Sequence, residues 1–252
     1  MKLLRLLILP CLFAAAPTLG VLLWAITPDT RPLVEGQLTV TRWIPGSGKT
    51  QVTVGPQTPH WTPEKSISKH LVHAVLVSED ARFYHHFGID CVEIWKSIHT
   101  NISTGAYTRG ASTITQQVVK MASLYRDKTL WRKLREVLGA IYLERQLDKT
   151  QILEWYLNLA NFGHGAYGVD NAAQLYFAKP AEQLSVSESV HLALVLPSPN
   201  TWSKGLKDQD LQEQQRKRFE SILTQMKKMN FINESLWDQA IFQGNFGSPI
   251  HL

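Results

Sequence analysis

Cysteine is scarce in this chain, which has only two such residues, Cys11 and Cys91, among 252. Their spacing is not that of a metal-binding motif, and no other cluster of metal-ligand residues is visible. This excludes a disulfide framework and a structural zinc site. Charged residues make up only 19% of the chain and hydrophobic residues 44%. That balance excludes a disordered or fibrous protein and leaves a globular chain of one domain, at most two.

The surplus of positive charge is modest, with 26 Lys and Arg against 21 Asp and Glu and a formal net charge of +5. It fits either a solvated basic surface or an anionic partner such as lipid headgroups, pyrophosphate or nucleic acid. The tripeptide Gly48-Lys49-Thr50 resembles the end of a phosphate-binding loop. However, the first glycine of that motif would fall at Trp43, and no strand–loop–helix pattern follows. We therefore expect neither nucleotide nor nucleic-acid binding.

The longest stretch without charge runs from Leu6 to Ile26, and a bilayer core of ~30 Å needs about 20 residues to span. Lys2 and Arg5 precede this stretch, so the positive-inside rule puts the N-terminus in the cytoplasm and everything after Thr27 outside. A cleaved signal peptide is the alternative, because Ala14-Ala15-Ala16 resembles a cleavage site. The apolar run continues for ten residues beyond that site, so we favour an uncleaved anchor.

The chain therefore divides into three expected parts. Residues 1–30 are a cytoplasmic stub and transmembrane anchor, residues 31–60 a juxtamembrane segment, and residues 61–252 the working domain. Within the second part, Gln37–Ile44 and Gln51–Val54 alternate like strands. Turn residues between them, from Pro45 to Gly48, predict a β-hairpin.

From residue 61 onward the hydrophobic pattern is helical, which predicts an all-α fold. Thr62-Pro63 is the start signal of a helix that ends at Ser78-Glu79-Asp80. Other helices are expected to start at Thr113 with Gln116, to cover Thr129–Leu147, to start at Asp148 with Gln151 and at Ser185 with Glu188, and to cover Leu211–Met226.

The helix over Thr129–Leu147 has an apolar stripe and a polar face. The stripe, which we expect to be buried, consists of Leu130, Leu134, Val137, Leu138 and Ile141. At ~100° per residue, Arg132 and Glu136 lie together on the opposite face, which we expect to be outward.

The first segment that could carry chemistry begins at Glu79 and Asp80. A carboxylate at a helix C-terminus lies in the negative potential of the helix dipole, which raises its proton affinity and suits a general base. The alternative is a solvated acidic helix end with His86 as a packing residue.

The second segment runs from Arg109 to Gln117 and is followed by Lys120. Its glycine allows the backbone close to a ligand, and the hydroxyls of Ser112 and Thr113 at a helix start suit an anionic or hydroxyl-rich group. An ordinary N-cap explains those hydroxyls but not the two glutamines and the lysine.

The third segment is a run of cations, Lys128, Arg132, Lys133 and Arg135, around Glu136. Such a run is usually a solvated helix face. A carboxylate amid cations is also what a site would need to hold a pyrophosphate and a sugar acceptor together.

Together these segments resemble the peptidoglycan glycosyltransferases of glycosyltransferase family 51, over roughly Trp61 to Asn200. The matching motifs are Glu79, Asp80, Phe83, His86 and Gly88; Gly110 to Gln117; Arg132, Lys133 and Glu136; Ile152 to Asn158; and Tyr176, Phe177 and Lys179. Two positions depart from the family pattern. Ala111 replaces a common glycine, and Lys128 stands where an arginine is often found, which keeps the charge but loses bidentate phosphate geometry.

The resemblance implies a lysozyme-like helical fold with a cleft facing the membrane. The donor would be the lipid-linked growing glycan and the acceptor lipid II, joined by an inverting reaction that forms β-1,4 bonds. Glu79 would be the general base, and Glu136 would orient the acceptor or organise the cations. Pyrophosphate or substrate would be bound by Lys120, Lys128, Arg132, Lys133, Gln116, Gln117, Ser112, Thr113, Asp80 and His86. Glu154, Tyr156 and Asn158 would be structural, and Asn161–Gly165 a turn.

The resemblance further implies a single-pass protein of the bacterial inner membrane with its catalytic domain on the periplasmic side, working beside other cell-wall synthesis proteins. No cofactor is expected, and nothing in the sequence supports a divalent cation that would assist pyrophosphate. Ser66 and Lys69 fit Ser-x-x-Lys, but the other penicillin-binding motifs do not follow, so we expect a monofunctional transferase.

Two alternatives remain open. A lytic transglycosylase or muramidase also uses a glutamate on a lysozyme-like scaffold, but it has no phosphate leaving group, which the cations at Lys120–Lys133 argue against. A non-catalytic, membrane-tethered scaffold for cell-wall enzymes would not need the polar motifs at the helix starts.

Overall fold

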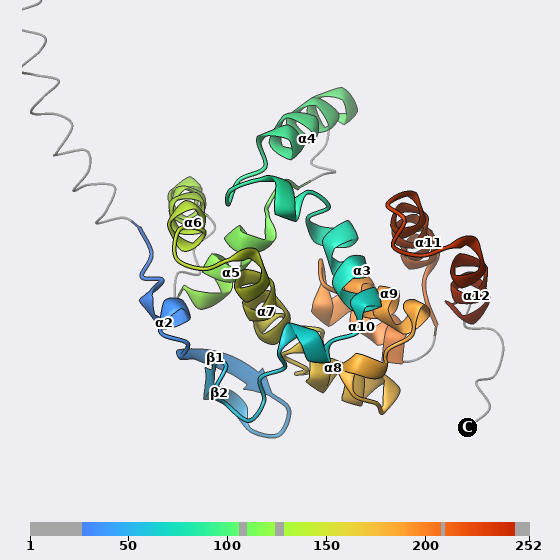
Figure 1. The fold of residues 1–252 in the computed structure, drawn as a ribbon, viewed down its shortest axis with the longest axis horizontal. Coiled ribbons are helices and arrows are strands. Elements are labelled where there is room, and N and C mark those ends of the chain that lie inside the picture. The colour runs from blue at the N-terminus through green and yellow to red at the C-terminus, as the bar shows by residue number, and fades with distance from the viewer. Residues whose placement is uncertain (1–26, 106–109, 124–128, 208–209, 245–252) are drawn as a thin grey trace, which may run out of the picture.

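The computed structural model describes residues 27–105, 110–123, 129–207 and 210–244, and these are mostly helical (Figure 1). The α-helices are α2 (Arg31–Val34), α3 (Lys69–Glu79), α4 (Cys91–Thr104), α5 (Ile114–Ala122), α6 (Leu130–Leu143), α7 (Lys149–Leu159), α8 (Val169–Phe177), α9 (Val186–Val195), α10 (Pro199–Lys207), α11 (Glu213–Lys228) and α12 (Glu234–Gly244). Short 3₁₀ turns cover Glu64–Ser66, Phe83–His85 and Ala181–Gln183. The predicted helical character of the domain is confirmed; its lysozyme-like topology stays a prediction.

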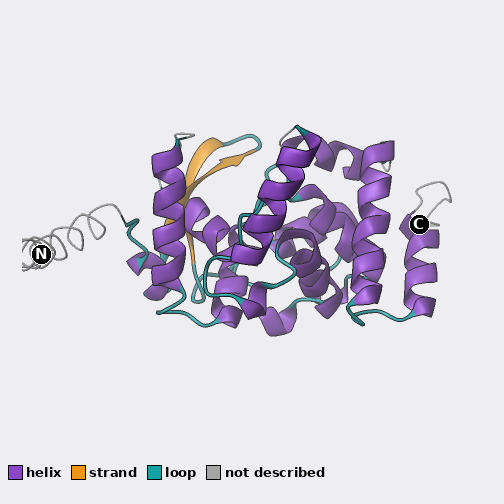
Figure 2. Cartoon of the chain, turned by 90° about the horizontal axis from the view of Figure 1, so that it is seen from above, coloured by secondary structure: helices purple, strands orange, loops and turns teal. Residues whose placement is uncertain are grey.

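The predicted hairpin is present as the antiparallel strands β1 (Leu38–Ile44) and β2 (Gly48–Val54), paired from Leu38 with Val54 to Ile44 with Gly48. The second strand begins three residues before the predicted Gln51, so the connecting turn is shorter than expected. Figure 2 shows the hairpin at one end of the molecule, with α11 and α12 at the other.

The predicted membrane span, Leu6–Ile26, lies outside the described residues. Among the helices that the structure does describe, none has both the length and the apolar character needed to cross a bilayer.

The core is built around α7, which lies near the middle of the ribbon in Figure 1. Its buried side chains include Ile152, Leu153, Trp155, Tyr156 and Leu157. Helix α5 packs against both α6 and α7, while α3 packs against α9, and α11 packs against both of them. The fold therefore brings the C-terminal end of α3, the start of α5 and the C-terminal helix α11 into one region.

Helix α3 begins later than predicted, at Lys69 rather than near Thr62. The reason lies in the motif on α7. The side-chain amide of Asn158 accepts from the Thr62 N–H at 2.8 Å and donates to the Thr62 carbonyl at 2.9 Å, and Glu154 accepts from the Glu64 N–H at 2.8 Å. These bonds hold residues 62–64 against α7, and the chain then forms only a 3₁₀ turn over Glu64–Ser66 before it becomes extended at Ile67. The structural role expected of Glu154 and Asn158 fits these contacts.

The predicted helix caps are confirmed in part. Full capping boxes form at Asp148 with Gln151 and at Ser185 with Glu188. At α5, Thr113 accepts from the Gln116 N–H as predicted, but the Gln116 side chain does not return to the cap. Its oxygen accepts a hydrogen bond from Lys133 instead. The helix expected to reach Leu147 ends at Leu143, where a turn leads into the cap of α7.

The buried face of helix α6 differs from the predicted one. Leu130 is 92% exposed and Leu134 37% exposed, whereas Glu136 is only 4% exposed. The inward residues are Glu136 and the small Gly139 and Ala140, which allow close packing against α5. Of the apolar stripe that we expected in the core, Leu130 and Leu134 are exposed, and Val137, Leu138 and Ile141 are half-buried. Glu136 is buried in a network with residues at the start of α5.

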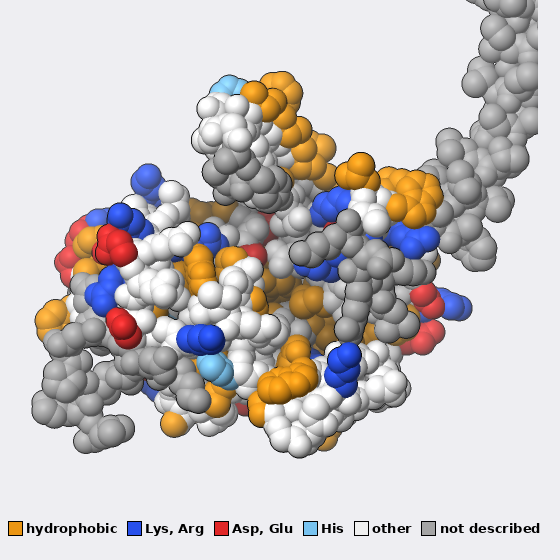
Figure 3. Space-filling model, turned by 180° about the vertical axis from the view of Figure 1, so that it is seen from behind, with side chains coloured by type: hydrophobic (Ala, Val, Ile, Leu, Met, Phe, Trp, Pro, Cys, Tyr) orange, Lys and Arg blue, Asp and Glu red, His pale blue; other side chains and the backbone are white. Residues whose placement is uncertain are grey.

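Five of the described helices were not predicted: the short α2, and α4, α8, α10 and α12. A signal for α4 was present, since Asp90 caps its start by accepting from the Val92 and Glu93 N–H groups, and Gly105 ends it in the left-handed conformation. Helix α4 stands out from the rest of the ribbon in Figure 1 and, among its residues, buries only Ser97. Figure 3 shows hydrophobic side chains along this protruding helix.

Candidate active site

Glu79 is the last residue of α3, and its side chain is 11% exposed. Gln117 of α5 donates a hydrogen bond to its Oε2 at 3.0 Å, and the Ser78 hydroxyl donates to its Oε1 at 3.2 Å. Arg218 of α11 lies 3.8 Å from the same Oε1. The carboxylate is thus held from two helices as well as by its own neighbour.

This carboxylate lines a pocket of about 680 Å³. Its walls come from the end of α3, the starts of α4 and α5, and one side of α11, and they include Asp80, Glu93, Gly110, Ser112, Thr113 and Gln117. A pocket of this size with several converging polar groups is the usual form of a small-molecule or sugar site.

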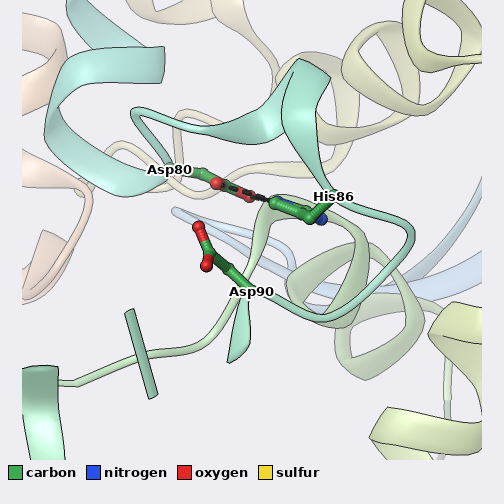
Figure 4. Close-up of side chains that lie close together, drawn as sticks. All are labelled: Asp80, His86 and Asp90. Carbon is green, nitrogen blue, oxygen red and sulfur yellow. Dashed lines mark hydrogen bonds and ion pairs between the residues drawn. The ribbon is translucent and has the colours of Figure 1, made fainter. Parts of the chain in front are cut away.

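Asp80 and His86, both predicted to bind substrate, contact each other in the structure (Figure 4). The Nε2 atom of His86 lies 3.0 Å from each carboxylate oxygen of Asp80. The same carboxylate accepts from the Ile114 N–H at 2.9 Å, which fixes the start of α5 to the end of α3. Asp80 is 7% exposed. This geometry gives both residues an organising role in the site.

Asp90 lies close to this pair (Figure 4). Asp80, His86 and Asp90 each have one possible metal-ligand atom, and these three atoms lie within 4.8 Å of one another. However, Asp90 Oδ1 accepts from two N–H groups of α4, and its Oδ2 accepts from Arg82 at 2.9 Å. Burial by itself raises the pKa of Asp90, but these hydrogen bonds and the Arg82 charge outweigh it and leave that pKa below its usual value. Both carboxylates already accept hydrogen bonds from neighbouring groups of the protein. We therefore assign the cluster a structural role, in which it connects the end of α3 to the starts of α4 and α5.

Gly88 explains how the loop after α3 reaches the other helices. Its φ is +77°, and a Cβ there would lie 2.9 Å from the backbone of Ala140, so only glycine fits without a shift. Its carbonyl accepts from the Thr113 hydroxyl at 2.8 Å. The hydroxyl of Thr113, a predicted substrate residue, therefore caps α5 by accepting from the Gln116 N–H and also holds the loop at Gly88.

On α6, Lys133 is the centre of a second cluster. Its Nζ donates to Gln116 at 2.8 Å, to Ser112 at 2.9 Å and to Glu136 at 3.2 Å. The other oxygen of Glu136 lies 3.1 Å from Arg132 Nε. The structure thus joins five of the predicted residues into one network around a buried carboxylate.

The two carboxylate clusters meet at α5, because adjacent glutamines of that helix contact them. Gln117 reaches Glu79, and Gln116 reaches Lys133, which in turn reaches Glu136. Lys120, one turn further along, is exposed. No hydrogen bond or ion pair joins its side chain to another of the described residues. Lys128, the remaining predicted cation, lies outside them.

The side chain of Tyr156, on α7, is buried in the core. Burial raises its pKa well above the usual value, and the nearby charges of Glu79 and Asp80 raise it further. Tyr156 therefore stays a neutral phenol at physiological pH. The predicted turn at Asn161–Gly165 is confirmed, with the Phe162 N–H bonded to the Ala166 carbonyl, and Lys179 pairs with Glu188 at 2.8 Å.

Arg218 is the residue at this site that sequence reasoning missed. It belongs to a helix predicted only as an apolar stripe, and it lies 140 positions from Ser78, to which it donates a hydrogen bond. Arg218 lies in the middle of an amphipathic helix and belongs to no recognisable motif, so the neighbouring sequence does not indicate that it reaches the site.

Comparison with known proteins adds the following. A family model described as Transglycosylase matches residues 47–227. Penicillin-binding protein 1A of Aquifex aeolicus (strain VF5) is 37% identical over 194 residues, covering 77% of this chain and 26% of that protein. The biosynthetic peptidoglycan transglycosylase of Rhodospirillum centenum (strain ATCC 51521 / SW) is 40% identical over 171 residues, which are 64% of this chain and 72% of that protein. The biosynthetic peptidoglycan transglycosylase of Shewanella denitrificans (strain OS217 / ATCC BAA-1090 / DSM 15013) is 45% identical over 148 residues, which are 59% of this chain and 64% of that protein. The chain spans about a quarter of the length of the first of these relatives.

Proposed function

This chain belongs to the transglycosylase family, and from that premise we propose that it is a peptidoglycan glycosyltransferase that polymerises lipid II into β-1,4-linked glycan. One observation carries the proposal. Glu79 is held at both oxygens while it faces a polar pocket of about 680 Å³. A fixed carboxylate in such a pocket suits proton removal from a sugar hydroxyl.

In the proposed reaction, Glu79 takes the proton of the acceptor's 4-hydroxyl as that oxygen attacks the anomeric carbon of the donor. The bond from that carbon to the pyrophosphate oxygen breaks, and polyprenyl pyrophosphate leaves with the electron pair. Attack opposite the leaving group inverts the anomeric carbon. Charge then grows on the pyrophosphate, where fixed cations give most of their stabilisation.

The cations for that role are Lys120, Lys128, Arg132 and Lys133. Glu136 supports the last two, because its buried carboxylate contacts both of them. A glycan-cleaving enzyme expels a sugar hydroxyl rather than a pyrophosphate, so it would not need this cluster. That difference favours the polymerase over the lytic alternative.

The direct test gives the purified full chain labelled lipid II and, separately, finished glycan strands. We expect lengthened lipid-linked chains from the first substrate and no change in the second. Cleavage of finished strands would identify the lytic enzyme, and no reaction with either substrate would identify the scaffold.

Lys120 to Ala is expected to lower single-turnover polymerisation at saturating lipid II by roughly 10²-fold, because its help would be greatest in the transition state. The melting temperature should not change, since the side chain is exposed. Lys217 to Ala, also exposed but on the outer side of α11, is the matched control and should keep the parent rate. Normal turnover of the Lys120 variant would show that the pyrophosphate assignment is wrong.

We also propose that the catalytic domain lies against a membrane on the periplasmic side, with residues 1–30 as a single-pass anchor. The support is the outward apolar surface of α4 and α6, which includes Trp95, Ile102, Leu130 and Trp131, with 71%, 76%, 92% and 51% exposure. Large apolar side chains beside lysines and arginines are typical of helices that lie in a bilayer interface.

Changing Trp95 and Ile102 together to Ser is expected to slow polymerisation in liposomes by about tenfold, because confinement to the surface raises the effective concentration of both lipid substrates. In detergent micelles the rate should stay near the parent value. Phe242 to Ser is the control, since Phe242 is 73% exposed on α12 at the other end of the molecule. Equal slowing in micelles and liposomes would argue for a folding defect instead.

A further inference from the structure

We infer that Arg218 of α11 is a positioning residue for Glu79, acting through Ser78 to hold the carboxylate in the orientation that proton removal needs. The inference rests on the proposed function, since it concerns the base of that reaction. It adds a residue from the C-terminal helix to a site otherwise built from α3, α5 and α6.

The contacts form a short relay. An Nη2–H of Arg218 donates to the Ser78 hydroxyl at 3.1 Å, and that hydroxyl donates to Glu79 Oε1 at 3.2 Å. The same Nη2 lies 3.8 Å from Oε1. Hydrogen bonds in such a chain polarise and strengthen one another. Gln117 holds Oε2 from the other side, so the carboxylate is fixed between α5 and α11.

The charges around the pocket explain why a cation is needed there. Among its described lining residues, Glu79, Asp80, Asp90 and Glu93 are acidic, and Arg218 is the only lysine or arginine. Asp80 contacts His86, Asp90 contacts Arg82, and Glu93 contacts Lys96, so each of the other three acidic residues has its own basic partner. Arg218 is the cation that lies next to Glu79 itself.

Arg218 is itself held in place. Its guanidinium lies 5.8 Å from the centre of the Trp202 ring, and the neighbouring Phe219 is buried in the core. Its side chain is 35% exposed. Of the described cations assigned to pyrophosphate, Lys120 belongs to α5, and Arg132 and Lys133 belong to α6, so Arg218 on α11 is not part of that cluster. A direct contact between Arg218 and substrate is the competing explanation, and the experiment separates the two.

The experiment is a double-mutant cycle on the full chain, using Arg218→Gln, Glu79→Gln, both together, and Arg218→Lys. In lipid II polymerisation, Arg218→Gln should lower kcat by roughly 10- to 100-fold, since small misplacements of a catalytic group cost about that much, with KM within about threefold. Arg218→Lys should recover part of the loss. In the Glu79→Gln background, Arg218→Gln should add less than about threefold, because it acts through Glu79. Lys217→Gln, on the adjacent exposed position, should match the parent.

Two results would overturn the inference: a loss in the Glu79→Gln background as large as in the parent, or a change confined to KM. Either would make Arg218 a substrate contact. The parent's own polymerisation tests the proposed function separately. If the parent is inactive, the melting temperatures of the parent, Arg218→Gln, Glu79→Gln and the double variant still decide the matter. Non-additive shifts support the Arg218–Glu79 contact, and additive shifts refute it.

Discussion

Glu79 to Gln is expected to slow lipid II polymerisation by roughly 10²–10⁴-fold, the usual effect of losing a general base. Glutamine keeps the shape of the side chain and can still accept the hydrogen bond from Gln117, but it cannot take a proton from the acceptor hydroxyl. The measurement is single-turnover polymerisation of labelled lipid II, with the melting temperature recorded in parallel. The melting temperature should change little, so that the lost rate reports chemistry and not unfolding.

The matched control is Glu220 to Gln, which removes the same charge from an exposed position on α11. Its rate should lie within experimental error of the parent. Polymerisation by the Glu79 variant within threefold of the parent would remove Glu79 from the role of base. Glu136 would then be the carboxylate to examine next.

Glu136 to Gln is expected to affect both stability and rate. The side chain is 6% exposed and contacts Arg132 and Lys133, so the change leaves two neighbouring cations without their common counter-charge. The side chains of Arg132 and Lys133 are 22% and 42% exposed, so water screens both partners in part. The cost should therefore lie below the about 3–5 kcal/mol that is typical of breaking a fully buried ion pair, at roughly 1–3 kcal/mol. Because Lys133 also holds Gln116 and Ser112, polymerisation should fall by about 10²-fold even well below the melting temperature.

Urea denaturation and single-turnover kinetics on the same preparation measure the two effects. Glu213 to Gln is the control, since Glu213 forms an exposed pair with Lys217 at the same spacing of four residues, with both side chains 74% exposed. Its change should stay within about 0.5 kcal/mol. A Glu136 variant as stable and as active as that control would mean that the cation cluster does not depend on this carboxylate.

Local features were the part of the structure that could be predicted from the sequence. The caps at Asp148 and Ser185 and the end of α3 at Glu79 depend on contacts between residues a few positions apart. The hairpin is local as well, since its two strands are joined by a short turn. Neighbouring residues decide such features, so a single sequence contains the information.

Helix α6 shows where that reasoning ends. Its periodicity correctly predicted an amphipathic helix but not which face is buried, because the hydrophobic pattern assumes that water surrounds the outer side. The partners of its polar face are Gln116 on α5 and Ser112 just before that helix, about 20 positions away. The exposed side chains of Leu130, Trp131 and Leu134 at the start of α6 fit the proposal that this end of the helix lies against a membrane.

The sequence by itself determined the helical class, the hairpin, the motif residues and, through their resemblance to a family, the chemistry to expect. Only the tertiary structure decided that Asp80 accepts from the Ile114 N–H at the start of α5, that consecutive glutamines of α5 face two separate carboxylates, and that Arg218 reaches Glu79 from α11. The physical reason is distance along the chain. Capping and periodicity act within a few residues, whereas these contacts exist only after helices far apart in sequence have packed together.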